Sequence, residues 1–189
     1  MKFVTYDAGN GARVGLVNAA GIVDLAKHAG VNSLRALIAD GKLDAMAAYA
    51  DAAADHALDD VSFLPVIPDP VHIWCVGVNY MDHLQEAIDV GLPRSKSEHP
   101  MIFGRYADTL VGHKENMMKS PVFNKFDYEC ELAVIIGKGG RHIAKEDALS
   151  HVVGYSCFNE GSARDWQYHT SQVAPGKNFA KTGGFGPRI

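Results

Sequence analysis

Two glutamates, Glu129 and Glu131, lie one residue apart in the stretch DYECEL. The run around them is apolar and typical of a β-strand, in which residues i and i+2 point to the same face. Two like charges on one partly buried face repel each other, and an unpaired buried carboxylate is costly. A cation bound between them removes both penalties, and carboxylate, water and substrate oxygens suit Mg²⁺ or Mn²⁺. The alternative is a solvated edge strand with two exposed acids.

Further side chains suited to chemistry stand at the ends of predicted elements. Glu160 follows the strand-like segment GYSCF, while His83 and Glu86 lie three residues apart, on one face of a predicted helix. A carboxylate beside an imidazole fixes its tautomer and raises its basicity, as a general base requires. A surface ion pair is the alternative for His83 and Glu86. Lys177, in GKNF, lacks the glycine spacing of a phosphate loop and locally resembles a surface lysine.

The composition is ordinary for a folded protein and narrows the possible partners. The chain has 189 residues, 47% of them hydrophobic, and a formal net charge of −4, which gives no electrostatic reason to expect nucleic acid or an anionic membrane as a partner. No segment has the length of a membrane span, and the first residues lack a secretory signal pattern. The three cysteines, Cys75, Cys130 and Cys157, lie in apolar runs with no zinc spacing. They predict buried thiols in a reducing compartment, so we expect a cytoplasmic protein.

The first third of the chain predicts a small module of hairpin and helices. Glycines around Asn10 separate two strand-like runs, KFVTYDA and RVGLVNA, which is a strong hairpin signal. A third strand is expected over residues 21–25, then a helix in SLRALIADG capped by Asn32 or Ser33, then an alanine-rich surface helix over residues 43–58. The proline-punctuated segment FLPVIPDPVH predicts an extended linker. We therefore place the module in residues 1–68 and a second region in residues 69–189.

The second region alternates predicted strands and short helices. Strands are expected in HIWCVGVNY, in MIFGRY, in the acidic run and at residues 154–158, and helices in HLQEAIDVG, over residues 145–153 and from Ala163 onward. Residues 91–100 are polar and flanked by glycine and proline, which predicts a mobile loop. No G-x-S-x-G, H-E-x-x-H or G-x-G-x-x-G motif occurs, so serine hydrolase, zinc protease and dinucleotide-binding functions lack support.

The order of these segments is more specific than any one of them. VGVNYMDHLQEA, PMIFGR, DYECELAVIIGKGGRHI, VVGYSCFNEGSARDWQ, PGKNF and GGFGP together resemble the fumarylacetoacetate hydrolase family, from about residue 70 to the end. The module before them resembles the small domain found in many bacterial members. The resemblance implies an α+β fold, mostly β, in which a mixed β-sandwich roll, incomplete here, follows a small α/β module.

The resemblance also implies that the loop of residues 91–100 is a lid, and it implies roles for individual residues. Three acidic residues are expected to be ligands of Mg²⁺ or Mn²⁺. A histidine–glutamate pair, together with a lysine near the substrate carbonyl, is expected to make up the catalytic group. Three further side chains are expected to bind substrate. In this sequence the expected ligands are Glu129, Glu131 and Glu160, the catalytic residues His83, Glu86 and Lys177, and the substrate-binding residues Arg105, Arg164 and Gln167.

Three features depart from the family pattern. Glu160 stands where the family usually has aspartate, and Ala180 replaces an aspartate that commonly follows the lysine motif. Family members continue well beyond the position of Ile189, so we expect a C-terminally truncated chain that forms a homodimer when full length.

The implied function is metal-dependent hydrolysis of a carbon–carbon bond in acylpyruvate or fumarylacetoacetate-like β-diketone acids. The small-molecule partner is then a 2-oxo acid or a 1,3-dicarbonyl compound. One alternative is a decarboxylase or isomerase of aromatic catabolism, or a ureidoglycolate-type lyase. Another is an inactive truncated remnant.

Overall fold

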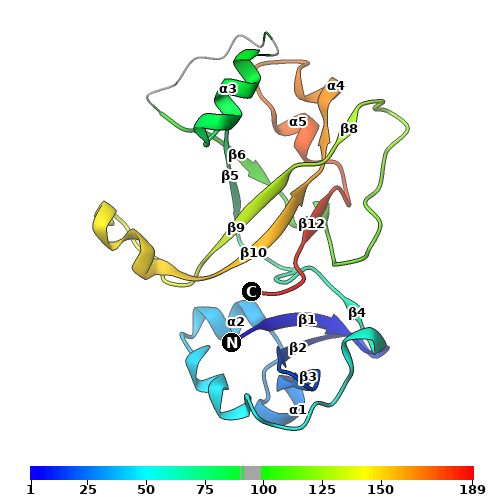
Figure 1. Cartoon of the computed structure of the whole chain (residues 1–189), viewed down its shortest axis with the longest axis vertical. Coiled ribbons are helices and arrows are strands. Elements are labelled where there is room, and N and C mark those ends of the chain that lie inside the picture. Colours follow the sequence, from blue (N-terminus) through cyan, green and yellow to red (C-terminus); the bar gives the residue numbers. More distant parts are fainter. Residues whose placement is uncertain (90, 92–98) are drawn as a thin grey trace.

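A computed structural model of the chain describes residues 1–89, 91 and 99–189 (Figure 1). Most of the loop expected to act as a lid, residues 91–100, therefore lies outside the described residues. The fold is α+β and mostly sheet, as expected. No helix in the described ranges combines the length and apolar character needed to cross a membrane.

The N-terminal sheet has the strand order β3-β2-β1-β4. Its predicted hairpin is confirmed, because β1 and β2 pair antiparallel and the Asp7 carboxylate accepts hydrogen bonds from the N–H groups of Gly9, Asn10 and Gly11 in the turn. Both turn glycines have φ near +98°, a conformation that strains other residues. The strands are β1 (Phe3–Asp7), β2 (Ala12–Val17), β3 (Ile22–Asp24) and β4 (Ser62–Phe63).

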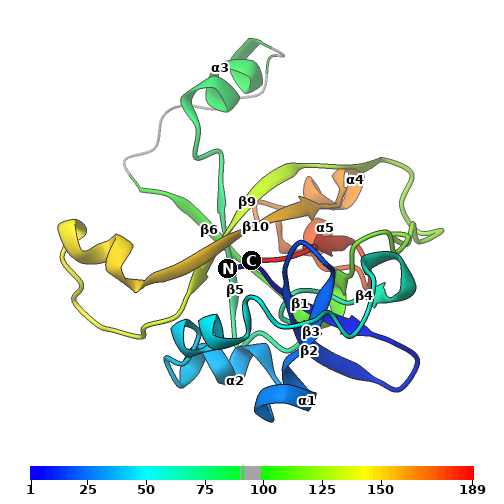
Figure 2. The ribbon, with the colours of Figure 1, turned by 60° about the horizontal axis from the view of Figure 1, so that its bottom comes forward.

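Two short helices lie against this sheet (Figure 2). Helix α1 (Leu25–Ala29) begins at Asp24, and α2 (Leu34–Ala39) begins at Ser33, whose hydroxyl caps it as one of the two predicted candidates. The expected helix over residues 43–58 is wrong. Only the 3₁₀ helices η1 (Asp44–Tyr49) and η2 (Leu58–Asp60) form there. The Asn18 side-chain amide donates hydrogen bonds to the carbonyls of residues 50 and 52, and residues 55 and 56 form backbone hydrogen bonds with Ile22 instead of with a continuous helix.

The second region is built on two long antiparallel strands, β9 (Cys130–Ile136) and β10 (Val152–Glu160). The sheet order is β7-β12-β10-β9, completed by β7 (Leu110–Val111) and β12 (Gly183–Phe185). Side chains alternate along β9 as predicted: the acidic face is the more buried one, whereas the other face exposes Leu132, Val134 and Ile136.

Two smaller strand pairs and several short helices complete the second region. In Figure 1, α3 stands beyond the β5–β6 pair, away from the N-terminal sheet. The predicted helix over residues 145–153 is instead a 3₁₀ helix over Lys145–His151. The elements are β5 (Ile73–Gly77), α3 (Met81–Asp89), β6 (Met101–Arg105), η3 (Ala107–Thr109), β8 (Phe126–Asp127), η4 (Lys145–His151), β11 (Ser162–Ala163), α4 (Arg164–Gln167) and α5 (Ala174–Lys177).

The two regions share one apolar core. Phe3 and Ile189 exchange backbone hydrogen bonds, and Val66 donates to the carbonyl of Phe185. Val66 and Ile67 are buried, so this part of the predicted linker is packed rather than solvated. The domain boundary at residue 68 stays a prediction.

Candidate active site

Three carboxylates converge where β10 ends beside the start of β9. Glu131 lies opposite Phe158 across the two strands, and the N–H of Glu160 donates to the carbonyl of Glu129 at 2.9 Å. One carboxylate oxygen from each glutamate lies within 4.8 Å of the other two. We call Glu129, Glu131 and Glu160 the acid cluster. The sequence-based expectation that these three residues meet is therefore matched by the geometry, while their role as ligands stays a prediction.

Glu129 is held by three neighbouring donors. Its Oε1 accepts hydrogen bonds from Lys177 Nζ at 2.6 Å and from the Ser162 hydroxyl at 2.5 Å, and it lies 3.0 Å from Arg164 Nη1. Burial alone would raise the pKa of Glu129, but these donors outweigh it and hold that pKa below its ordinary value. Glu129 is therefore ionised at neutral pH.

Glu160 is almost completely buried, with 4% of its surface exposed. Its Oε2 accepts a hydrogen bond from Lys177 Nζ at 2.9 Å, and its Oε1 accepts one from the Cys75 thiol at 3.1 Å. Arg105 Nη1 lies 3.6 Å from the same Oε1. A buried carboxylate needs such partners, and here strands β5, β6 and helix α5 each supply one.

Glu131 differs from its two neighbours. Within the described part of the chain, no hydrogen bond or ion pair reaches its carboxylate. Burial, followed by the charges of Glu160 and Glu129, raises the pKa of Glu131 above its ordinary value. The acid cluster therefore contains one carboxylate that lacks a counter-charge of its own.

The cluster fits a hard divalent cation. Its donors are carboxylate oxygens from three residues on adjoining strand ends, which is the ligand chemistry that Mg²⁺ and Mn²⁺ prefer. The unpaired Glu131, with its raised pKa, is the observation that calls for additional positive charge. Glu129, Glu131 and Glu160 are the residues that would hold the ion.

Lys177 lies at the centre of the cluster rather than on the surface, where local sequence alone had placed it. Its side chain is 3% exposed and lies over the ring of Phe103, 5.4 Å from the ring centre. Gly176 allows this position, because a Cβ there would lie 2.6 Å from backbone atoms of Gln167. A glycine at 176 thus lets α5 pack directly on α4 and bring the lysine under the acids.

Arg105 is also buried, and its donors are directed at the protein. The guanidinium donates to the hydroxyls of Thr109 and Thr182, at 3.1 and 2.7 Å, and to the carbonyl of Gly161 at 3.4 Å. Burial lowers the pKa of Arg105, and Glu160 opposes that effect. The geometry assigns Arg105 to supporting Glu160 more directly than to contacting substrate, and its substrate-binding role stays a prediction.

Arg164 and Gln167 lie at the open side of the cluster on α4. Arg164 donates through Nε and Nη2 to Asp127, while its Nη1 donates to the Gln167 side chain at 2.9 Å and pairs with Glu129. The Arg164 side chain keeps 27% of its surface exposed. Of the three residues expected to bind substrate, Arg164 is the one whose guanidinium is both next to the acids and accessible.

His83 and Glu86 lie on α3 and are exposed to solvent. The charge of His83 lowers the pKa of Glu131, so the imidazole is within electrostatic range of the cluster. No hydrogen bond joins His83 to Glu86 within the described part of the chain. The structure therefore brings four expected residues, Lys177, Arg105, Arg164 and Gln167, together around the three acids and leaves this pair at the edge.

Two residues that contact the acid cluster were not predicted from the sequence. Cys75 was expected only as a buried thiol, and Ser162 was given no chemical role, yet each donates a hydrogen bond to a cluster carboxylate. Ser162 could have been noticed from its place two residues after Glu160, since alternate strand residues share a face. The prediction that all three cysteines are buried is wrong for Cys130 and Cys157, which are exposed.

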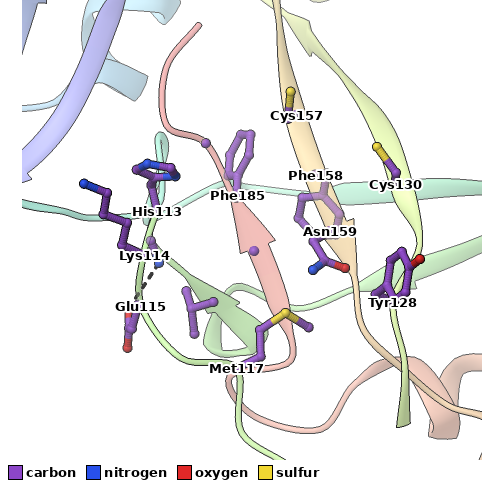
Figure 3. Close-up of a pocket in the computed structure, with 14 residues that line it drawn as sticks. His113, Lys114, Glu115, Met117, Tyr128, Cys130, Cys157, Phe158, Asn159 and Phe185 are labelled. Atoms are coloured by element: carbon purple, nitrogen blue, oxygen red, sulfur yellow. Dashed lines mark hydrogen bonds between the residues drawn. The ribbon is translucent and has the colours of Figure 1, made fainter.

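A separate cavity of about 330 Å³ lies beside β12 and β10 (Figure 3). Cys130, Cys157 and Asn159 line it, and none of the three cluster glutamates does. Cys130 and Glu131 are adjacent on β9 and so point to opposite faces of the sheet. The cavity is therefore distinct from the acid cluster.

Comparison with known proteins places the chain among enzymes with this arrangement of segments. The model of the fumarylacetoacetate (FAA) hydrolase C-terminal family matches residues 72–189. Oxaloacetate tautomerase YisK of Bacillus subtilis is 42% identical over 135 residues, which cover 70% of this chain and 44% of YisK. The human mitochondrial oxaloacetate tautomerase FAHD2A is 38% identical over 132 residues, covering 69% of this chain and 40% of its own.

Solved structures match the whole chain, including the N-terminal module. A fumarylacetoacetate hydrolase from Exiguobacterium antarcticum is 32% identical with a TM-score of 0.80, covering 100% of this chain and 66% of that one. A maleylpyruvate hydrolase from Sphingobium sp. SYK-6, in complex with manganese(II) and pyruvate, is 26% identical with a TM-score of 0.77 over the same shares. The chain thus spans about two fifths of the length of these curated relatives and about two thirds of these structures.

Proposed function

This chain belongs to the fumarylacetoacetate hydrolase family, and from that premise we propose that it is a metal-dependent enzyme acting on small 2-oxo acids or 1,3-dicarbonyl acids. The observation that carries the proposal is the acid cluster, in which three carboxylate oxygens meet within 4.8 Å and one of the acids lacks a counter-charge. The manganese and pyruvate bound to the maleylpyruvate hydrolase relative support both the cation and the substrate class. We propose Mg²⁺ or Mn²⁺ as the cofactor.

The chemistry follows from charge that develops on the substrate. A divalent cation, when bound, supplies Lewis-acid polarisation to two oxygens of a 2-oxo acid. Arg164, accessible beside Glu129, orients the substrate and stabilises negative charge on its oxygens. Gln167, bonded to Arg164, fixes the orientation of that guanidinium.

We assign proton transfer to His83 and Glu86 on α3. We assign His83 as the base that takes the proton from the substrate's α-carbon, or from water in hydrolysis, with Glu86 orienting its imidazole. Their exposure on α3 fits a group that approaches the acids only when substrate is present. The electrostatic influence of His83 on Glu131 supports the assignment.

Among reactions that share these steps, keto–enol tautomerisation of a 2-oxo dicarboxylate is the first candidate. The support is that YisK and FAHD2A, both named oxaloacetate tautomerases, are 42% and 38% identical to this chain. Carbon–carbon hydrolysis of an acylpyruvate-like acid is the second candidate, supported by the maleylpyruvate hydrolase and fumarylacetoacetate hydrolase structures. Both reactions place negative charge on the oxygens of an enolate, which forms by loss of a proton from the α-carbon in tautomerisation and by carbon–carbon cleavage after attack of water in hydrolysis.

An assay with a small substrate panel separates these reactions. Enol–keto conversion of oxaloacetate, pyruvate release from acylpyruvates and decarboxylation of oxaloacetate are measured with Mn²⁺ or Mg²⁺ present. We expect tautomerisation to exceed the other two, and its rate to decrease sharply in Glu131→Gln but not in Glu115→Gln, because Glu115 pairs with Lys181 and is not part of the acid cluster. Turnover of none of these compounds by metal-loaded protein would contradict the proposal.

We further propose a cytoplasmic homodimer. The three cysteines are free thiols, as is usual in a reducing compartment. The exposed apolar residues of β9 form a surface of the kind that pairs with another protein surface.

A further inference from the structure

Lys177 has a second relation to the acid cluster besides any contact with substrate. Its ammonium group lies between two of the three carboxylates, 2.6 Å from Glu129 Oε1 and 2.9 Å from Glu160 Oε2. These are short, charge-assisted hydrogen bonds. The lysine thus occupies part of the same oxygen set that would hold a cation.

Two of the three donors of the ammonium group are already used in this arrangement. A lysine carries three N–H donors and no acceptor. Two of them reach the carboxylates, and the group also lies over the Phe103 ring. With 3% of its side chain exposed, Lys177 cannot turn to solvent without leaving these contacts.

Two of the three acids already have cationic partners. Glu129 pairs with Lys177 and Arg164, and Glu160 pairs with Lys177 and Arg105. An added divalent ion brings two further positive charges to the oxygens that Lys177 contacts. At such separations two cations repel strongly in a partly buried site.

We propose that Lys177 is a resident counter-ion that competes with the divalent cation for Glu129 and Glu160. This inference rests on the proposed function. Lys177 neutralises the acids while the cation is absent, and a cation that enters displaces its ammonium group. The displaced donors then become available to the oxygens of the substrate, so the cation binds before the substrate does.

Calorimetric titration with MnCl₂ tests the competition. Lys177→Met removes the competing charge at similar length, and we expect it to lower the Kd for Mn²⁺ at least tenfold. Lys181→Met is the matched control, because Lys181 is 51% exposed and pairs with Glu115 instead. An equal or higher Kd in Lys177→Met than in wild type would overturn the counter-ion proposal alone. Absence of Mn²⁺ binding in both wild type and Lys177→Met would overturn the proposed function with it.

A second measurement uses the unaltered protein. An amine-reactive acylating reagent is applied with and without MnCl₂, and modification of each lysine is followed by peptide mass spectrometry. We expect Mn²⁺ to increase acylation of Lys177 severalfold relative to that of Lys181, because its ion pairs are lost. Unchanged or decreased acylation of Lys177 in a protein that binds Mn²⁺ would show that the two cations do not compete.

Discussion

Glu131 is the residue on which the candidate site depends most. Glu129 and Glu160 already have cationic partners, whereas the charge of Glu131 is opposed by burial and by those two neighbours. A group with a raised pKa beside like charges is typical of functional sites. A cation that binds all three acids would relieve this repulsion directly.

The first prediction concerns the pH dependence of metal binding. Protonated Glu131 is not a ligand, and because its pKa lies above the ordinary 4.5, Mn²⁺ affinity should begin to fall at a higher pH than for an unperturbed glutamate. Calorimetry over a pH series checks this. Glu131→Gln should bind weakly and lose much of the pH dependence; a variant with the wild-type curve would remove Glu131 from the site.

The second prediction concerns His83. Loss of a general base typically lowers a rate by about 10²–10⁴. His83→Ala should reduce kcat in that range with little change in Kd for Mn²⁺, whereas His142→Ala, at an exposed site in the loop after β9, should leave both unchanged. A decrease in kcat of less than about threefold would exclude His83 as the base.

The residues of the cluster were predictable in part. The i, i+2 spacing of Glu129 and Glu131 places them on one face, and the strand alternation of β9 follows it. The partners were not predictable, since Cys75 and Glu160 are 85 positions apart, and Lys177 and Glu129 are 48 apart. Only the packing of β5, α5 and β10 determines such contacts.

At the scale of elements, local signals succeeded where a turn or cap decides the structure. The β1–β2 hairpin and the Ser33 cap depend on neighbours within a few residues. The helix expected over residues 43–58 does not form because Asn18 and Ile22, distant in sequence, form hydrogen bonds with the backbone of that segment. Alanine content favours a helix only where no tertiary partner competes.

The third prediction concerns Asp55, which ties this segment to α1. Its carboxylate accepts from Lys27, from His28 and from the N–H of Asp24; burial opposes them, yet they lower its pKa from 3.8 to about 2. A lowered pKa stabilises the folded state above the unfolded value, and this contribution disappears as pH falls toward 2.

Asp55→Asn should therefore melt at a lower temperature than wild type at pH 7. The difference should shrink as pH falls from about 4 to about 2. Asp59→Asn is the control, because the Asp59 side chain is 94% exposed. A difference in Tm that stays constant across this pH range would contradict the role of the Asp55 charge.

At the scale of the whole molecule, the surface between the two regions is buried, whereas the outer face of β9 is exposed. The N-terminal sheet and the second region share a core through Phe3, Val66 and Ile189. The outer face of β9 instead leaves Leu132, with 56% exposed, beside other apolar side chains. The family resemblance predicted the fold class and the mostly-β second region, but not that Val66 and Ile67 of the linker are buried, because proline spacing carries no information about tertiary contacts.

The fourth prediction concerns this outer face. An exposed apolar row favours association, so sedimentation velocity should detect dimers that increase with protein concentration. Val134→Lys, in the middle of the row, should shift the protein toward monomer. Leu58→Lys, on the N-terminal module, should not. Equal sedimentation of all three proteins at every concentration would contradict an interface on β9.

The most direct test of the central claim is Mn²⁺ titration of wild-type protein and Glu131→Gln by calorimetry, with and without oxalate as a 2-oxo acid mimic. If the acid cluster is a cation site that presents the ion to such substrates, wild type binds one Mn²⁺ per chain and oxalate lowers the Kd. Binding is then lost or greatly weakened in Glu131→Gln, while Glu115→Gln keeps it. Wild-type affinity in Glu131→Gln, or no effect of oxalate on a bound ion, would contradict the account.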